Sequence, residues 1–198
     1  MEQETKQEEK GAGFSRSVIE WLEDFVVMLG IFCLLLTFVV RQISVEGFSM
    51  MPNYHDGERV LITANPGKLV QGDVVVIVHA IEEGPVIKRV IATEGQKVDI
   101  DSDKGCVLID DVPLDDRRFG IENGITRTYF HLNGVTIEEL PIVVPEGHVF
   151  VLGDNRQDSK DSRFFGPVDK RNVLGKALWK FYPLSEFGPA DKALKADG

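Results

Sequence analysis

The sequence has little cysteine, with only Cys33 and Cys106 in 198 residues. Cys33 lies inside an apolar run and Cys106 lies far from it, so we expect no disulfide framework and no pairing of the two within one chain. Positive charge is also scarce, since the formal net charge is −10. Because phosphate backbones bind clusters of Lys and Arg, this balance argues against a nucleic-acid partner.

Histidine is scarce as well, with four in the chain. None of the four has the spacing of a metal-ligand set or of a Ser-His-Asp triad, and no Gly-x-Ser-x-Gly segment is present. The sequence therefore implies no metal ion and no cofactor. They also leave any nucleophilic serine without a histidine base.

The most prominent feature that is present is an apolar run from Phe25 to Val40. Ser17 followed by Glu20 has the spacing of a helix capping box just before this run. A helix over residues 18–41 would be about 36 Å long, enough for a hydrocarbon core of about 30 Å. We therefore expect one N-terminal transmembrane helix over residues 18–41.

The residues around this run predict its orientation. Basic residues are more numerous before the run than just after it, which places the N-terminus in the cytoplasm (Lys6, Lys10 and Arg16 against Arg41). The leading segment is acid-rich, and no small-x-small pattern follows the run, so we expect a retained anchor rather than a removed signal. Residues 1–17 are then a polar cytoplasmic tail.

Short β-branched runs separated by turns follow the anchor. They predict an all-β body over residues 42–183, either an open sheet or barrel-like, with a flexible polar tail over residues 184–198. A hairpin is expected around Asn133-Gly134. The expected strands are 59–63, 74–78, 86–92, 96–100, 107–109, 149–152 and 173–182.

Ser49 is a candidate nucleophile that lies eight residues after Arg41, between Gly47 and Pro52. Eight extended residues reach only about 26–29 Å, so the expected anchor would hold Ser49 beside the membrane surface. A serine beside glycine is more often a simple turn residue. Its hydroxyl is also a poor nucleophile unless a base activates it.

Lys88 is the candidate base, because it interrupts an apolar strand. Side chains alternate along a strand, so Lys88 and Arg89 point to opposite faces. If Arg89 takes solvent, Lys88 shares the buried face with Val86 and Val90. Desolvation then lowers the lysine pKa from about 10.4, and the neutral amine could take the proton of Ser49. The alternative is a lysine that extends along the strand to water.

The segment from Gly153 to Arg163 has no apolar side chain, although apolar runs flank it on both sides. Its opposite charges are interleaved, so Asp and Arg side chains could pair and fix the loop, and its hydroxyls could bond an amine. Taken alone, this pattern is more often a hydrophilic turn.

Together these segments resemble bacterial type I signal peptidase, the membrane-bound Ser/Lys protease that removes signal peptides, in its single-span, Gram-positive-like form. The resemblance covers residues 15–183. It rests on four motifs in the family's order: Ser49-Met50-Met51-Pro52, Gly72-Asp73-Val74-Val75, Lys88-Arg89-Val90, and Gly153 through Phe165-Gly166.

The resemblance implies roles for five residues, two of them catalytic and three supporting. Ser49 would be the nucleophile and Lys88 the general base. Ser159 would hydrogen-bond and orient the lysine amine. Asp161 and Arg163 would form a supporting ion pair that holds the last motif. The family's fold is a mostly antiparallel β-sheet body, in keeping with the strand pattern.

The resemblance also implies the substrate and the location. Val45 and Ile87 would help line shallow pockets for small side chains one and three residues before the cut. The substrates would be secretory preproteins with signal peptides, and the partners would include membrane lipid. The catalytic domain would lie outside the cytoplasm, on the cell membrane.

The chain departs from the family pattern at four positions. Asn53 replaces a usual threonine, and Glu94 and Gln96 replace a proline and an aspartate around Gly95. Gly47 stands where some relatives have an oxyanion-hole serine, which leaves the Ser49 N–H as the surest oxyanion donor.

Two other functions are compatible with parts of the sequence. A self-cleaving repressor-type Ser/Lys peptidase shares the dyad, although the apolar run and the last motif argue against it. The other is an inactive membrane-anchored β module that only binds, and the joint presence of Ser49, Lys88 and Ser159 argues against it.

Overall fold

The computed structural model of the protein describes residues 18–34, 40–78, 84–126 and 140–190. The chain divides into two units, Met1–Val39 and Val40–Gly198. In the first unit residues 18–34 form a helix whose side chains are all exposed. Across the part of the chain that is described, no helix combines the length and apolar character needed to cross a bilayer.

The expected helix over residues 18–41 is wrong at its C-terminal end. Val40 and Arg41 begin strand β1 (Val40–Ser44), which pairs antiparallel with β2 (Arg59–Thr63). A β-branched residue such as Val40 loses side-chain freedom in a helix and packs well in a strand. The ladder with β2 also satisfies the backbone groups of this segment, so pairing overrides the continuous apolar pattern.

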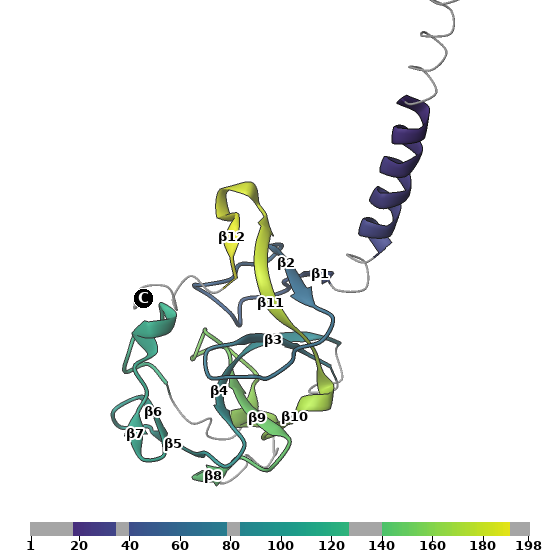
Figure 1. The fold of residues 1–198 in the computed structure, drawn as a ribbon. Coiled ribbons are helices and arrows are strands. Elements are labelled where there is room, and N and C mark those ends of the chain that lie inside the picture. Colours follow the sequence, from purple (N-terminus) through teal and green to yellow (C-terminus); the bar gives the residue numbers. More distant parts are fainter. Residues whose placement is uncertain (1–17, 35–39, 79–83, 127–139, 191–198) are drawn as a thin grey trace, which may run out of the picture. The chain divides into compact units, whose positions relative to one another are not determined.

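The second unit is mostly β and antiparallel, as the sequence predicts (Figure 1). Its short helices are η1 (Asp116–Phe119), α2 (Ser162–Phe165), η2 (Lys170–Asn172) and η3 (Leu184–Glu186). Its other strands are β3 (Val74–Ile77), β4 (Val86–Thr93), β5 (Lys97–Asp101), β6 (Cys106–Ile109), β7 (Val112–Pro113), β8 (Ile142–Val143), β9 (His148–Leu152), β10 (Val168–Asp169), β11 (Val173–Tyr182) and β12 (Gly188–Pro189).

Two sheets organise these strands. The larger has the order β1-β2-β11-β3-β4-β9-β10, with β12 paired to β11, and the smaller has the order β7-β6-β5-β8. The seven strands expected from β-branched runs correspond to β2, β3, β4, β5, β6, β9 and β11. The hairpin expected around Asn133-Gly134 lies outside the described residues.

The centre of the larger sheet is covered on both faces. Every residue of β3 is buried, and so is every residue of β4 except its two ends. One face packs in a cluster with Val76 and Ile87, and the other in a cluster with Val75 and Val90. A strand covered on both faces has no side on which a charged residue meets water.

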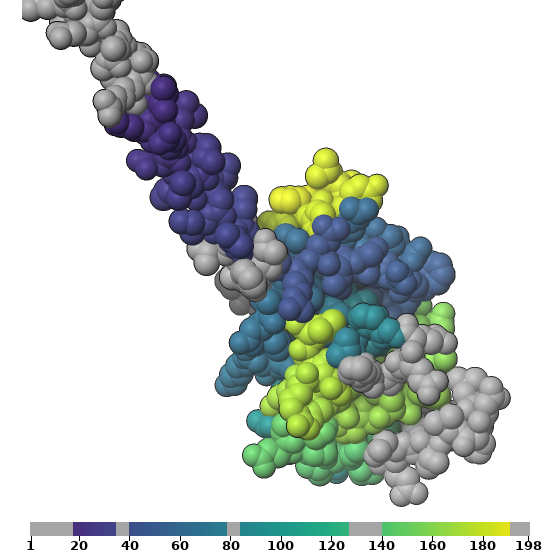
Figure 2. Space-filling model, turned by 90° about the vertical axis from the view of Figure 1, so that its right-hand side faces the viewer, coloured from purple at the N-terminus to yellow at the C-terminus, as the bar shows by residue number. Residues whose placement is uncertain are grey.

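The expectation of a flexible tail over residues 184–198 is wrong for residues 184–190. These residues form η3 and β12, and Ala190 is buried. The Tyr54 hydroxyl donates to the Ala190 carbonyl at 2.5 Å. The strand β12, in yellow in Figure 2, pairs antiparallel with β11, which also pairs with β2. Residues 191–198 lie outside the described residues.

Candidate active site

Ser49 lies in the turn that follows β1. Gly47 has a φ of 80°, a conformation that favours glycine. The Gly47 N–H donates to Asp56 Oδ1 at 2.8 Å. The next side chain, Met50, is buried in the core, whereas Ser49 is only half-buried. The core therefore fixes the turn and leaves the hydroxyl accessible.

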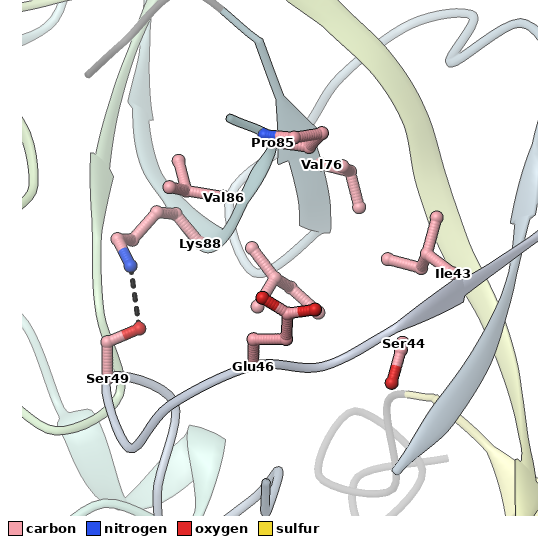
Figure 3. A pocket seen from close by; sticks show the side chains of 9 residues that line it. Ile43, Ser44, Glu46, Ser49, Val76, Pro85, Val86 and Lys88 are labelled. Atoms are coloured by element: carbon pink, nitrogen blue, oxygen red, sulfur yellow. Dashed lines mark hydrogen bonds between the residues drawn. The ribbon is translucent and has the colours of Figure 1, made fainter. Parts of the chain in front are cut away.

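Lys88 lies on β4 opposite Val75 of β3, and its side chain is 3% exposed. Its Nζ is 2.7 Å from Ser49 Oγ, within hydrogen-bond distance (Figure 3). The structure thus brings together the two residues that the sequence selects as nucleophile and base.

Burial lowers the pKa of the Lys88 amine from 10.5 to about 8, because desolvation disfavours the charged form. The carboxylates of Asp161 and Asp154 act against this and raise the pKa, while the Arg163 guanidinium lowers it. About half of the amines are therefore neutral at pH 8. A neutral amine can accept the proton of the Ser49 hydroxyl.

The burial of Lys88 was argued on the condition that Arg89 takes solvent. That condition does not hold, because the Arg89 side chain is 2% exposed. Its Nε and Nη2 donate to the two carboxylate oxygens of Asp154, each at 2.7 Å, and its Nη1 donates to the Gly72 carbonyl at 2.9 Å. Its guanidinium also lies over the Phe119 ring, 5.0 Å from the centroid. Alternation holds, but both faces of β4 are buried.

The last motif contains a second buried ion pair, between Asp161 and Arg163. The Arg163 Nη2 is 2.7 Å from Asp161 Oδ2, and its Nε donates to Asp161 Oδ1 at 2.8 Å. Asp161 also accepts the Arg163 N–H as the cap of α2 and the Gly153 N–H at 3.0 Å. The Arg163 Nη1 donates to the Arg156 carbonyl at 2.7 Å. These bonds close the loop on itself.

Ser159 is buried where the last motif meets the nucleophile turn. A methyl group on Gly153 would lie 2.1 Å from Ser159 Oγ and 2.5 Å from the Ser49 carbonyl oxygen. Only glycine lets the three segments approach this closely. The Asn155 N–H donates to the same Ser49 carbonyl at 3.0 Å. The expected bond from Ser159 to the Lys88 amine stays a prediction.

A cavity of about 290 Å³ opens beside Ser49 and Lys88 (Figure 3). Ile87 lines it, whereas Val45 does not and is 2% exposed in the core beneath. Contact of either residue with substrate stays a prediction. The other lining residues are Ile43, Ser44, Glu46, Val76, Pro85 and Val86.

Asn53 has a structural role that the sequence did not reveal. Its Nδ2 donates to Asp154 Oδ2 at 2.8 Å and to the Phe119 carbonyl at 2.7 Å. Its own carbonyl accepts from Lys180 Nζ, which also pairs with Glu58 at 3.0 Å. This cluster ties the turn after Ser49 to the buried ion pairs. The one available signal in the sequence for this cluster was Lys180, a charged residue among the apolar residues of β11.

Glu94 and Gln96, which also depart from the family pattern, stabilise turns through hydrogen bonds. Glu94 accepts the Gly147 N–H at 2.7 Å and pairs with Lys170 at 2.8 Å. Gln96 accepts the Thr93 N–H at 2.8 Å. Within the described ranges, no group of three or more His, Cys, Asp or Glu side chains is placed to hold a metal ion.

Comparisons with known proteins point to one family. The family model described as signal peptidase, peptidase S26, matches residues 18–182. Signal peptidase IB of Staphylococcus aureus (strain COL) is 35% identical over 185 residues, covering 87% of this chain and 93% of its own length. Signal peptidase I of Bacillus licheniformis is 31% identical over 192 residues, covering 93% of this chain and 99% of its own length. A solved signal peptidase I from Enterococcus faecalis V583 is 28% identical, with a TM-score of 0.44, covering 57% of this chain and 98% of that one.

Proposed function

The chain belongs to the signal peptidase family, peptidase S26, and from this membership we propose that it removes signal peptides from exported preproteins. Its substrates would carry small residues one and three positions before the cut. The observation that carries the proposal is the 2.7 Å distance between Lys88 Nζ and Ser49 Oγ at the wall of a cavity. A hydroxyl beside an amine of lowered pKa is an activated nucleophile.

In the proposed reaction Lys88 is both base and acid. Neutral Lys88 accepts the proton of Ser49 as its Oγ attacks the scissile carbonyl carbon, and the resulting ammonium gives that proton to the leaving amine. The mature protein departs, and the signal peptide stays bound as an ester of Ser49. Lys88 then takes a proton from water as the water oxygen attacks the ester carbonyl carbon. It returns that proton to Ser49 Oγ as the ester bond breaks and the signal peptide leaves.

The developing oxyanion needs a hydrogen-bond donor. Position 47 is a glycine whose N–H donates to Asp56, so we assign the backbone N–H of Ser49 as the donor. The loop that contains Asp161 and Arg163 supports the Lys88 amine, and Ser159 orients this amine. These roles rest on burial and on the bonds that fix the last motif.

We further propose that the apolar segment before β1 anchors the enzyme in the cell membrane, with the N-terminus in the cytoplasm and the unit from Val40 outside. The exposed apolar side chains of residues 18–34 support this, because lipid would cover them. An anchored enzyme meets an anchored preprotein at a high effective concentration. Membrane lipid is therefore a partner of the enzyme.

The test is cleavage of a synthetic preprotein with an Ala-x-Ala site by the full chain in neutral detergent. Ser49→Ala and Lys88→Met should each lower kcat/KM by about 10³-fold or more. Ser185→Ala and Lys68→Met, which change exposed residues of the same types, should retain activity. Full activity of a folded Lys88→Met enzyme would exclude the lysine as base. Cleavage of the chain itself in place of the preprotein would favour a repressor-type peptidase.

A further inference from the structure

The cavity beside the dyad contains a carboxylate that the proposed reaction does not use. Glu46 lies three residues before Ser49 and is the one acidic side chain among the described residues that line the cavity. Figure 3 shows its carboxylate directed into the cavity, between the Ser49–Lys88 pair and Ile43. The surrounding wall is otherwise apolar apart from Ser44 and the dyad.

The carboxylate of Glu46 faces the cavity. Among the described residues no Lys, Arg or His forms an ion pair with it, although the buried Arg89, Arg156 and Arg163 each pair with an aspartate. The one amine in the cavity, Lys88, is bonded to Ser49. The carboxylate is exposed, so it can act on a group that enters the cavity.

We propose that Glu46 selects preproteins with a Lys or Arg side chain in the four residues before the cut, at the second or fourth position. This rests on the proposed function. In an extended peptide, side chains at these positions point away from the face that holds the small first and third residues. The small residues lie against the apolar wall, and a long, flexible basic side chain at the second or fourth position can turn back to reach the exposed carboxylate.

The size of the preference follows from the exposure of Glu46. An exposed ion pair corresponds to about a two- to fivefold change in kcat/KM. The preference should weaken as salt is raised, because salt screens the interaction of exposed charges. The screening length is about 10 Å at 0.1 M salt and shortens as salt is added.

The experiment uses the full chain in neutral detergent, so that no lipid charge concentrates basic peptides. Peptides with Ala one and three residues before the cut carry Lys, Ala or Glu at the second or the fourth position. The native enzyme should cleave the Lys peptides about two- to fivefold faster than the Ala peptides, and the Glu peptides more slowly still. Glu46→Gln should abolish this ranking, and Glu46→Lys should reverse it.

Glu146→Gln is the matched control, because it makes the same charge change at an exposed residue outside the cavity and should keep the native ranking. A native enzyme without charge preference, or a Lys preference that survives Glu46→Gln, would overturn the proposal about Glu46. In both cases native cleavage of the Ala peptide would leave the peptidase function intact. Absence of cleavage of every peptide by the native enzyme would overturn the function as well.

Discussion

Lys88 and Arg89 are adjacent on β4 and both are buried, yet their two faces of the strand are built in opposite ways. The Arg89 face satisfies its charge with both oxygens of Asp154 and the Gly72 carbonyl. The Lys88 face offers a hydroxyl, so burial lowers the pKa of its amine to about 8. A buried charge that is paired stabilises the site's framework, and one that is left poorly compensated becomes reactive.

Asp154 connects the two faces. It pairs with Arg89, accepts from Asn53, and raises the pKa of the Lys88 amine. Because Arg89 and Asn53 hold Asp154 in place, Asp154 acts on the Lys88 amine without forming an ion pair with it. The structural face therefore helps to set the protonation of the reactive face.

The largest expected difference between the two faces is in stability, when Arg89 and Lys88 are each replaced by methionine. Arg89→Met leaves Asp154 buried without its guanidinium, and should lower the free energy of unfolding by about 3–5 kcal/mol. Lys88→Met removes a poorly compensated buried charge, and should raise the free energy of unfolding at pH 7 by up to about 3 kcal/mol while abolishing cleavage. Urea denaturation of the full chain measures both.

The sign of the Lys88 effect follows from proton binding. The unfolded chain holds this proton up to about pH 10.5 and the folded chain only up to about pH 8. The cost of burial is therefore complete below pH 8 and disappears as the pH rises toward 10.5. Equal destabilisation by the two substitutions would remove the contrast between the faces.

The pH dependence of cleavage tests whether the Lys88 amine acts as the base. If neutral Lys88 is the base, kcat/KM should rise about tenfold per pH unit below pH 8 and level off above about pH 9. A substrate without groups that titrate in this range, together with circular dichroism at each pH, controls for other causes. A flat profile from pH 5 to 9 would contradict a neutral lysine base.

A smaller effect is expected where the loop meets the nucleophile turn. Gly153→Ala would place a methyl group 2.5 Å from the Ser49 carbonyl oxygen, and should cost about 1–3 kcal/mol of stability together with part of the activity. Gly175→Ala makes a similar clash 2.0 Å from the Thr63 carbonyl oxygen. It should cost stability without lowering kcat/KM per folded molecule. Equal activity losses would show that Gly153 has no special place beside Ser49.

The strands and the candidate base could be predicted because their signals are local. Runs such as 74–78 and 173–182 are β-branched and bounded by turns, and they form β3 and β11. Lys88 stood out as a charged residue inside such a run. The location of Ser49 beside Lys88 followed from the family's motif order, and the structure shows the two side chains in contact.

The errors arose where a distant segment decides the outcome. Alternation showed that Lys88 and Arg89 face opposite ways, but the partner that covers Arg89 is Asp154, 65 residues away in sequence. Val40 joined a strand because β2 pairs with it. Ala190 is ordered because Tyr54, 136 residues earlier, bonds it. None of these contacts leaves a local pattern.

The most direct test of a neutral Lys88 base is an NMR titration of the Lys88 side-chain amine in the full chain, with the resonance assigned by its loss in Lys88→Met. We expect a midpoint near pH 8, shifted by burial, and a lower midpoint when Asp161→Asn removes a carboxylate that raises the pKa. A midpoint near 10.5, the ordinary value for lysine, would contradict this expectation.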